Sequence, residues 1–165
     1  MNKQKGFSLI ELLIVVAIIL IIAAIAIPNL MQARVFSNET AAASQLRTVN
    51  TAEVSYSTAY SAVGYGTLAA LGGSAVPCVP DSGNACLIDN SLATNYNGNG
   101  KNGYNFSLTL TNSNGNYAAT GYPIAVGASG NNSFCSIEDG VVRKDTTGAN
   151  DSSYNTCAGL PALGN

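Results

Sequence analysis

The sequence predicts an α+β protein in which one long N-terminal helix packs on a roughly four-stranded antiparallel sheet. Three observations predict this fold. A largely apolar run fills residues 7–28, a one-faced helical pattern continues to residue 60, and short alternating segments follow after residue 103. A helix followed by a group of strands is typical of α+β folds, whose helices and strands are segregated. The length of 165 residues fits one domain.

The apolar run is long enough to cross a membrane. As a helix, Phe7 to Ile27 would measure about 31 Å, close to the thickness of a bilayer core. Lys3 and Lys5 precede it, and the positive-inside rule keeps that end cytoplasmic. A cleaved secretory signal peptide has a shorter apolar region and a better cleavage site. A plain membrane anchor explains the length and the lysines, but not the carboxylate of Glu11 inside the run.

The helix is expected to continue beyond the apolar run in an amphipathic form. Pro28 has no amide proton, so we expect it to break the helix locally, by bending or loosening it near Ala24. Beyond Pro28, one helical face is formed by Ala42, Leu46, Val49, Glu53, Tyr56 and Tyr60. This stripe should dock on the sheet. The charged residues of the region are expected to be solvated or to contact neighbouring molecules: Arg34, Glu39, Arg47 and Glu53.

The second half of the chain predicts a connecting loop and then a sheet. Residues 61–103 are expected to form the loop, with a short helix near Leu68–Leu71. Strands are expected over residues 104–110, 117–126, 133–138 and 141–145. Pro123 indicates an edge or a strand end, and Asp139-Gly140 is a favoured hairpin turn. On the first strand, one face is formed by Tyr104, Phe106, Leu108 and Leu110.

The composition argues against an enzyme. The chain has 7 basic and 9 acidic residues and no histidine, which is the commonest general base and metal ligand. No nucleophile–base pair is apparent, and we expect no cofactor. The net charge of −2 offers no basic patch, so nucleic acid is not expected as the primary partner. Asp139, Asp145 and Asp151 match no calcium loop, so no metal site is expected.

The start of the chain resembles a known family. Gly6-Phe7-Ser8-Leu9-Ile10-Glu11, the apolar run and Pro28 resemble the class III leader and N-terminal helix of type IV pilins and related pseudopilins. The resemblance covers residues 1 to about 60 closely. It implies that a prepilin peptidase cuts after Gly6 and methylates the new amino terminus of Phe7. It also implies four parts: a leader at 1–6, a transmembrane and filament-core helix at 7–28, an amphipathic helix half at 29–60 and a globular head at 61–165.

The resemblance gives Glu11 a role in assembly. An isolated carboxylate inside a membrane costs about 3 kcal/mol on insertion scales. The ammonium of a neighbouring subunit's Phe7 would neutralise Glu11 on docking, and mispaired registers would leave both charges buried and unmatched. The pair would therefore select register. The alternative is a Glu11 solvated at the level of the lipid headgroups. The family also implies that residues 23–28 melt when subunits pack into a filament.

Four cysteines lie on the side of the membrane to which the chain is translocated: Cys78, Cys86, Cys135 and Cys157. An even number there predicts disulfides in an oxidising compartment, and three connectivities are open. We expect sequential pairing, in which Cys135 and Cys157 attach the C-terminal loop to the sheet, as is common in pilins. The spacings contain no C-x2-C pair, which argues against zinc.

The function implied by the resemblance is that of a structural subunit of an extracellular type IV pilus. Its partners would be further copies of itself, the prepilin peptidase and methylase, the inner-membrane assembly machinery, and membrane lipid before assembly. The precursor would be a single-pass inner-membrane protein, and the filament would support adhesion, motility or uptake at the cell surface. Two alternatives stay open: a type II secretion pseudopilin, and a membrane-anchored binding domain or enzyme whose helix is not cleaved. Major and minor subunits are not distinguished.

Overall fold

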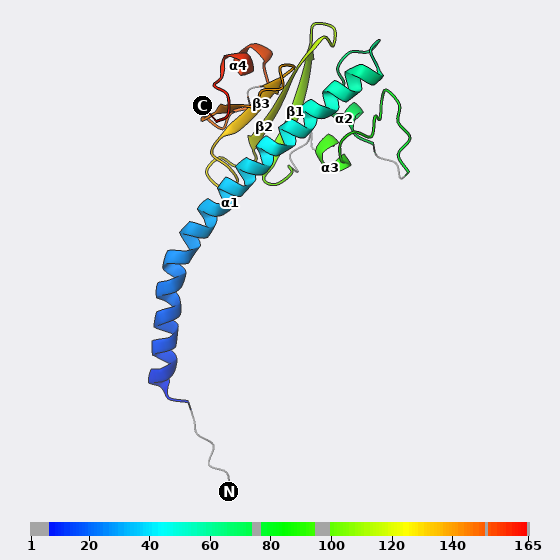
Figure 1. The fold of residues 1–165 in the computed structure, drawn as a ribbon. Coiled ribbons are helices and arrows are strands. Elements are labelled where there is room, and N and C mark those ends of the chain that lie inside the picture. The colour runs from blue at the N-terminus through cyan, green and yellow to red at the C-terminus, as the bar shows by residue number, and fades with distance from the viewer. Residues whose placement is uncertain (1–6, 74–76, 95–99, 151, 165) are drawn as a thin grey trace. The chain divides into compact units, whose positions relative to one another are not determined.

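The computed structural model describes residues 7–73, 77–94, 100–150 and 152–164 (Figure 1). Its contacts divide the chain into two units, Met1–Arg34 and Val35–Asn165. We call the first unit the stalk segment and the second the head, and we describe each by itself. The helix α1, Leu9–Ala59, contributes residues to both units. The leader expected at residues 1–6, with Lys3, Lys5 and Gly6, lies outside the described residues.

The described part of the stalk segment is Phe7, Ser8 and the N-terminal part of α1. The run contains no glycine to weaken a helix, and its side chains are almost all apolar and exposed. Pro28 lies inside α1 and does not end it. A proline removes one backbone hydrogen bond, here the one to Ala24, and the helix continues on both sides. The side chain of Asn29 donates a hydrogen bond to the Ile25 carbonyl at 3.1 Å. The helix is therefore not broken at Pro28. The melting of residues 23–28 on assembly into a filament stays a prediction.

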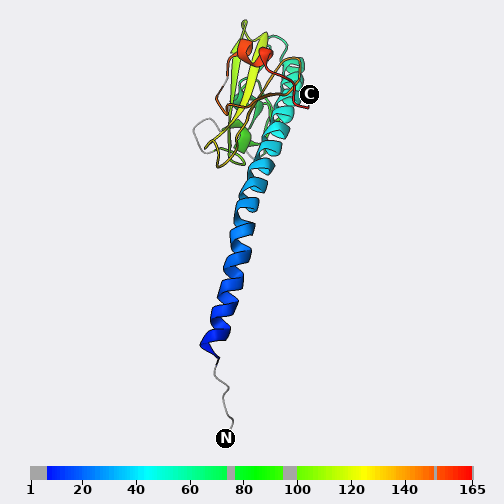
Figure 2. The same ribbon diagram turned by 90° about the vertical axis from the view of Figure 1, so that its left-hand side faces the viewer.

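The head is built from the C-terminal part of α1 and a four-stranded antiparallel sheet in the order β1-β2-β3-β4. The strands are β1 Tyr104–Thr111, β2 Asn116–Pro123, β3 Ser133–Ile137 and β4 Arg143–Asp145. Figure 2 shows the head part of α1 lying alongside the sheet. The α+β fold predicted from the sequence is confirmed. β2 ends at Pro123, earlier than predicted, because proline cannot donate to the next ladder bond.

The core of the head lies between α1 and the sheet. The expected stripe of α1 is buried at Ala42, Leu46, Val49, Glu53 and Tyr56, and Tyr60 packs against it partly buried. From the sheet, Tyr104, Phe106 and Tyr117 join the same cluster, and Leu108 and Leu110 pack against it. The period-two face predicted for β1 is therefore the face that meets the helix. The residues that follow the 3.6-residue period of α1 and those that follow the two-residue period of β1 therefore pack in one core.

The described residues of the head include three further, short helices. The helix predicted near residues 68–71 is present as α2, Leu68–Leu71, capped by the Thr67 side chain. The helices α3, Asn90–Ala93, and α4, Tyr154–Gly159, were not predicted, because each lies in a segment with too few residues to show a period. The hairpin of β3 and β4 turns at Gly140, whose φ of 72° favours glycine. Its register pairs Cys135 with Arg143.

Candidate functional site

The first turn of α1 places Glu11 against the backbone of Ser8. The Ser8 amide donates to Glu11 Oε2 at 3.0 Å, and the Leu12 amide donates to the Ser8 carbonyl at 3.3 Å. Ser8 is the residue before the helix and Glu11 its third residue, so this is the glutamate half of a capping box. The positive end of the helix dipole also stabilises a carboxylate at this position. In the single chain, Glu11 therefore caps the N-terminus of its own helix by accepting a hydrogen bond from the free Ser8 amide.

The capping interaction is a role that our sequence analysis missed. Ser8-Leu9-Ile10-Glu11 has the S-x-x-E spacing of a capping box, and it directly precedes an apolar run. That spacing was sufficient to predict the contact. The contact leaves room for a second partner of Glu11, because the Ser8 amide binds only Oε2.

The stalk segment exposes a continuous apolar surface. Phe7 is 79 % exposed, and exposed large apolar side chains follow it as far as Leu30 and Met31. α1 is long and apolar enough to cross a membrane by length and composition. Surfaces of this size on a soluble monomer mark contact with lipid or with protein. The apolar surface of the stalk segment is thus of the kind that a bilayer or other helices cover.

Glu39 is held by the head and is not freely solvated. Its Oε1 accepts hydrogen bonds from the amides of Asn131 and Asn132 at 2.9 and 3.2 Å. The Asn132 side chain donates to both carboxylate oxygens at 2.9 Å. Nearby, the Asn38 side chain donates to the Ser129 carbonyl at 2.8 Å. The expectation of a solvated or intermolecular Glu39 is corrected, because α1 uses it to fix the loop between β2 and β3.

Glu53 is the larger departure from the sequence analysis. It is 0 % exposed in the core, where its Oε2 accepts a hydrogen bond from the Gly66 amide at 2.9 Å. Within the described residues, Oε1 has no hydrogen-bond partner. Burial raises the pKa of Glu53 to about 7, and the Gly66 hydrogen bond opposes part of that rise. The position is on the core face that the helical period predicted, so a solvated Glu53 was wrong.

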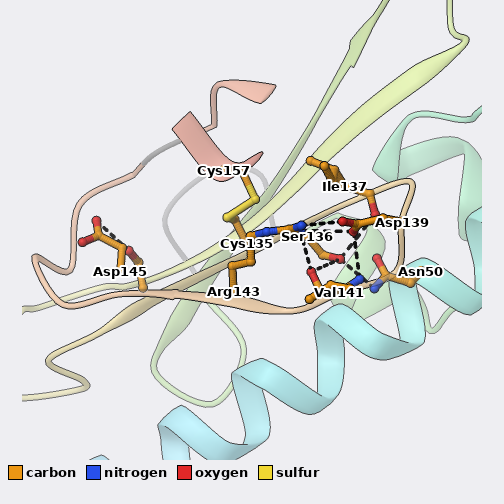
Figure 3. Close-up of a disulfide and its surroundings, with 10 residues drawn as sticks. Asn50, Cys135, Ser136, Ile137, Asp139, Val141, Arg143, Asp145 and Cys157 are labelled. Carbon is orange, nitrogen blue, oxygen red and sulfur yellow. Dashed lines mark hydrogen bonds and ion pairs between the residues drawn. A yellow bond between two sulfur atoms is a disulfide. The ribbon is translucent and has the colours of Figure 1, made fainter. Parts of the chain in front are cut away.

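Asn50 is a buried junction between α1 and the sheet (Figure 3). Its amide nitrogen donates to Ser136 Oγ at 2.8 Å and to the Gly140 carbonyl at 3.2 Å. Its carbonyl oxygen accepts from the Tyr117 hydroxyl at 3.0 Å. Ser136 Oγ in turn donates to the Val141 carbonyl at 3.1 Å. One asparagine thereby fixes the helix to β2, β3 and the turn after β3, a network in which each partner is satisfied.

The structure pairs the cysteines in sequential order. Cys78 is joined to Cys86, and Cys135 on β3 is joined to Cys157 on α4. Figure 3 shows the second disulfide on the sheet, close to Arg143. Ala118 and Ile137 bury these sulfurs in a second small apolar cluster. The disulfide therefore attaches the C-terminal segment to the face of the sheet opposite α1.

The aspartates considered for calcium are separately engaged. Asp139 accepts from Arg143 and from the Val141 amide, and this arginine lowers the pKa of Asp139. Asp145 is buried and accepts from the Thr147 amide at 2.9 Å, while Asp151 lies outside the described residues. Among the residues that the structure describes, no three acidic, cysteine or histidine residues form a metal-binding group.

The comparisons with known proteins bear on the N-terminal segment. The model of the prokaryotic N-terminal methylation motif matches residues 1–27. The type IV wide pilus major component of Thermus thermophilus is 62 % identical over 40 residues, 24 % of this chain and 30 % of that protein. The chain carries the N-terminal segment of a type IV prepilin. The type IV major pilin of Myxococcus xanthus is 48 % identical over 54 residues, 33 % of this chain and 24 % of that protein.

These relatives match only 40 and 54 residues of the chain. The chain spans between a quarter and a third of the length of the curated relatives it matches. No solved structure matches the chain. The matched region contains Gly6, Phe7, Ser8 and Glu11, the residues around the expected cut and the first helical turn.

Proposed function

We propose that this protein is a structural subunit of a type IV pilus, made as a membrane-anchored precursor and assembled into a filament. The observation that carries the proposal is the exposed apolar surface of the stalk segment, most of which lies within the N-terminal methylation motif of residues 1–27. The two relatives named above are pilus components, which supports a structural subunit and not an enzyme. A bilayer would cover the apolar surface before assembly, and other copies of the same helix would cover it afterwards.

Processing would act at the boundary between the leader and the helix. Hydrolysis of the Gly6–Phe7 peptide bond would release residues 1–6, with both leader lysines, and leave a new amino group on Phe7. Gly6 has no side chain to obstruct a protease. The amino group would then be methylated by the same peptidase. The prepilin motif at residues 1–27 supports this step.

Glu11 would then have two successive partners. In the precursor, its Oε2 accepts from the Ser8 amide, which helps the helix to begin. During assembly, the ammonium of a neighbouring copy's Phe7 would approach the same carboxylate from outside its own helix. A correctly docked neighbour would neutralise the charge, whereas a shifted one would bury it unpaired. Glu11 would therefore select register, and the capping bond would hold its carboxylate in place.

The remaining partners and locations follow from this assembly. The precursor would be a single-pass inner-membrane protein, extracted by a pilus assembly machinery and displayed as a filament at the cell surface. Chemically identical head-to-tail contacts whose rotation does not close would generate an open helix of subunits and not a ring. The head, with its two disulfides, would form the outer surface of that filament. Adhesion, motility and uptake are the roles that such a surface would serve.

The first experiment measures the intact mass and N-terminal sequence of this chain in filaments sheared from cells. We expect a chain that begins at N-methylated Phe7. A chain that is absent from the sheared material and still begins at Met1 in the membranes would refute processing and the filament role together. A processed chain found only in membranes would instead favour a type II secretion pseudopilin.

A matched pair of variants tests the role of Glu11. Glu11→Gln keeps an acceptor for the Ser8 amide but removes the charge, and we expect it to abolish sheared filaments while the membrane pool stays normal. Ser8→Ala keeps the backbone amide that Glu11 binds, and it should leave filaments in near-normal amounts. Normal filaments from Glu11→Gln would show that the charge has no part in assembly.

A further inference from the structure

Most charges of the head are satisfied within the head itself. Lys101 pairs with Asp89 at 2.6 Å, and Arg143 pairs with Asp139. The cations left over, among the described residues of the head, are Arg47 and Lys144, for which no ion pair is found. Two unpaired cations on a chain of net charge −2 call for an explanation.

The two unpaired cations line one groove. This groove has a volume of about 330 Å³ and lies between α1, β3, β4 and the C-terminal segment. Its apolar walls include Phe36, Phe134 and Leu163. The one carboxylate in it, that of Glu39, is already engaged by Asn131 and Asn132. We call this feature, with Arg47 and Lys144, the cationic groove.

Among the described carboxylates of the head, one is available to pair with Arg47 and Lys144. Glu53 and Asp145 are buried, Asp89 and Asp139 are paired, and Glu39 and Glu138 accept hydrogen bonds from neighbouring side chains. The exposed carboxylate that has no cation, among the residues described, is Asp81. It lies in the loop that the disulfide of Cys78 and Cys86 closes, which we call the disulfide loop.

The disulfide loop presents Asp81 in a fixed orientation. Asp81 Oδ1 accepts from the amides of Gly83 and Asn84 at 2.7 and 2.8 Å, which forms a tight turn. The Tyr56 hydroxyl donates to the Ser82 carbonyl at 2.6 Å and ties this turn to α1. A disulfide and three hydrogen bonds thus hold the loop, so little ordering entropy would be lost on docking.

The same two surfaces also carry the most exposed apolar side chains of the head. Val79 in the disulfide loop is 74 % exposed and Phe36 in the cationic groove is 72 % exposed, more than any other large apolar side chain described in the head. Each surface therefore combines one exposed apolar group with unpaired charge, and the charges are opposite in sign. Such complementarity fixes orientation and register more than it adds affinity.

The two surfaces lie at different positions along the head. The cationic groove uses α1 from Phe36 to Arg47, and the disulfide loop is attached at Tyr56, about 14 Å further along the helix from Arg47. When the loop of one copy docks in the groove of the next, the loop of that next copy can dock on a third, so the contact can repeat head to tail. In the open filament proposed above the contact is heterologous and its rotation does not close.

We propose that the disulfide loop of one copy docks into the cationic groove of another copy of this chain. Val79 packs against Phe36 and Leu163, and Asp81 lies between Arg47 and Lys144. This contact rests on the proposed filament and specifies which head surfaces meet in it. It gives the disulfide of Cys78 and Cys86 a role in assembly, since that disulfide holds the docking loop in shape.

Photo-cross-linking in sheared filaments tests the contact directly. The photo-reactive residue p-benzoylphenylalanine replaces Val79 in the full chain, and cross-linked peptides are identified by mass spectrometry. We expect a product that joins the disulfide loop to the peptide around Phe36 or Leu163 of a second chain. The same residue at Val126, which is 62 % exposed on another loop, is the control and should not give that product.

The outcomes separate this contact from the filament proposal. If filaments form but position 79 cross-links to a different surface, or to no second chain, the contact is refuted and the filament role stands. If the unmodified chain forms no filaments, the filament role fails and the contact fails with it.

Charge reversal gives a second, independent test. Asp81→Lys alone, or Arg47→Glu with Lys144→Glu, should each cause a loss of sheared filaments, and the three changes together should restore them. Thr109→Lys, an exposed position on β1, adds the same charge elsewhere and should cause no loss. Disulfide-intact chain in the membrane fraction shows that each variant folds. Folded variants whose combination forms no more filament than either reversal would overturn the contact.

Discussion

Replacing Glu53 by glutamine should remove most of the pH dependence of the stability of the head between pH 5 and pH 8. Glu53 is fully buried, its charge faces no cation in the described core, and only the Gly66 amide donates to it. Burial, and after it nearby carboxylates that include Glu53, raise the pKa values of Tyr56, Tyr65 and Tyr117, the ionisable groups around it. The charged form of Glu53 is therefore the destabilising one.

The magnitude follows from the pKa of Glu53, which rises from 4.5 to about 7 on folding. Below pH 4.5 the folded and unfolded carboxyls are both protonated, and the stability does not depend on this group. Between pH 4.5 and 7 the folded chain keeps a proton that the unfolded chain releases, so the free energy of unfolding falls as pH rises. At 1.36 kcal/mol per pKa unit, the full loss above pH 7 is about 3 kcal/mol.

The assay is thermal unfolding of the disulfide-intact full chain in detergent, followed by near-ultraviolet circular dichroism at pH 5 and pH 8. Relative to Glu53→Gln, the unmodified protein should lose roughly 6–12 °C in Tm between these two pH values. The window is favourable because the chain has no histidine, and the amino terminus is the other group whose ordinary pKa lies within it.

Glu39→Gln is the matched control. The Glu39 carboxylate is partly exposed and well hydrogen-bonded, so its loss should change the stability by a similar amount at both pH values. If the unmodified protein and Glu53→Gln showed the same dependence on pH, Glu53 would not be a buried titrating group. The account of the loop at Gly66 would then be incorrect.

Three further substitutions test the packing of the head by chemical denaturation. Replacing Cys135 and Cys157 by serine should lower the free energy of unfolding by roughly 3 kcal/mol, because the unfolded chain regains the freedom of the loop between them; an unchanged value would show that the sheet holds the C-terminal segment without the disulfide. Asn50→Ala should cost about 2–3 kcal/mol, since the Tyr117 hydroxyl and Ser136 lose a buried partner, and Tyr117→Phe combined with it should add little. Leu46→Ala should cost about 2–5 kcal/mol by leaving a cavity, whereas Val54→Ala, exposed on the same helix, should change the stability by less than about 0.5 kcal/mol.

The sequence by itself determined the features that depend on local pattern. The apolar run and the 3.6-residue stripe from Ala42 to Tyr60 specified α1, and the alternation from Tyr104 to Leu110 specified the core face of β1. Asp139-Gly140 placed the last hairpin, because its turn needs the left-handed backbone of Gly140. The capping contact of Ser8 and Glu11 was equally local and could have been predicted. Each of these follows from the period or turn chemistry of neighbouring residues.

Only the tertiary structure decided what depends on groups distant in the chain. Glu53 lies on the predicted core face but was expected to be solvated, and only the fold shows that it is buried and accepts a hydrogen bond from the Gly66 amide. The partner of Cys135 was one of several until α4 brought Cys157 to the sheet. Arg47 and Lys144 are far apart in sequence and meet only because β4 lies beside α1 at the groove. Periodicity tells which way a side chain faces, whereas its partner is set by long-range contacts that the folded chain as a whole must satisfy.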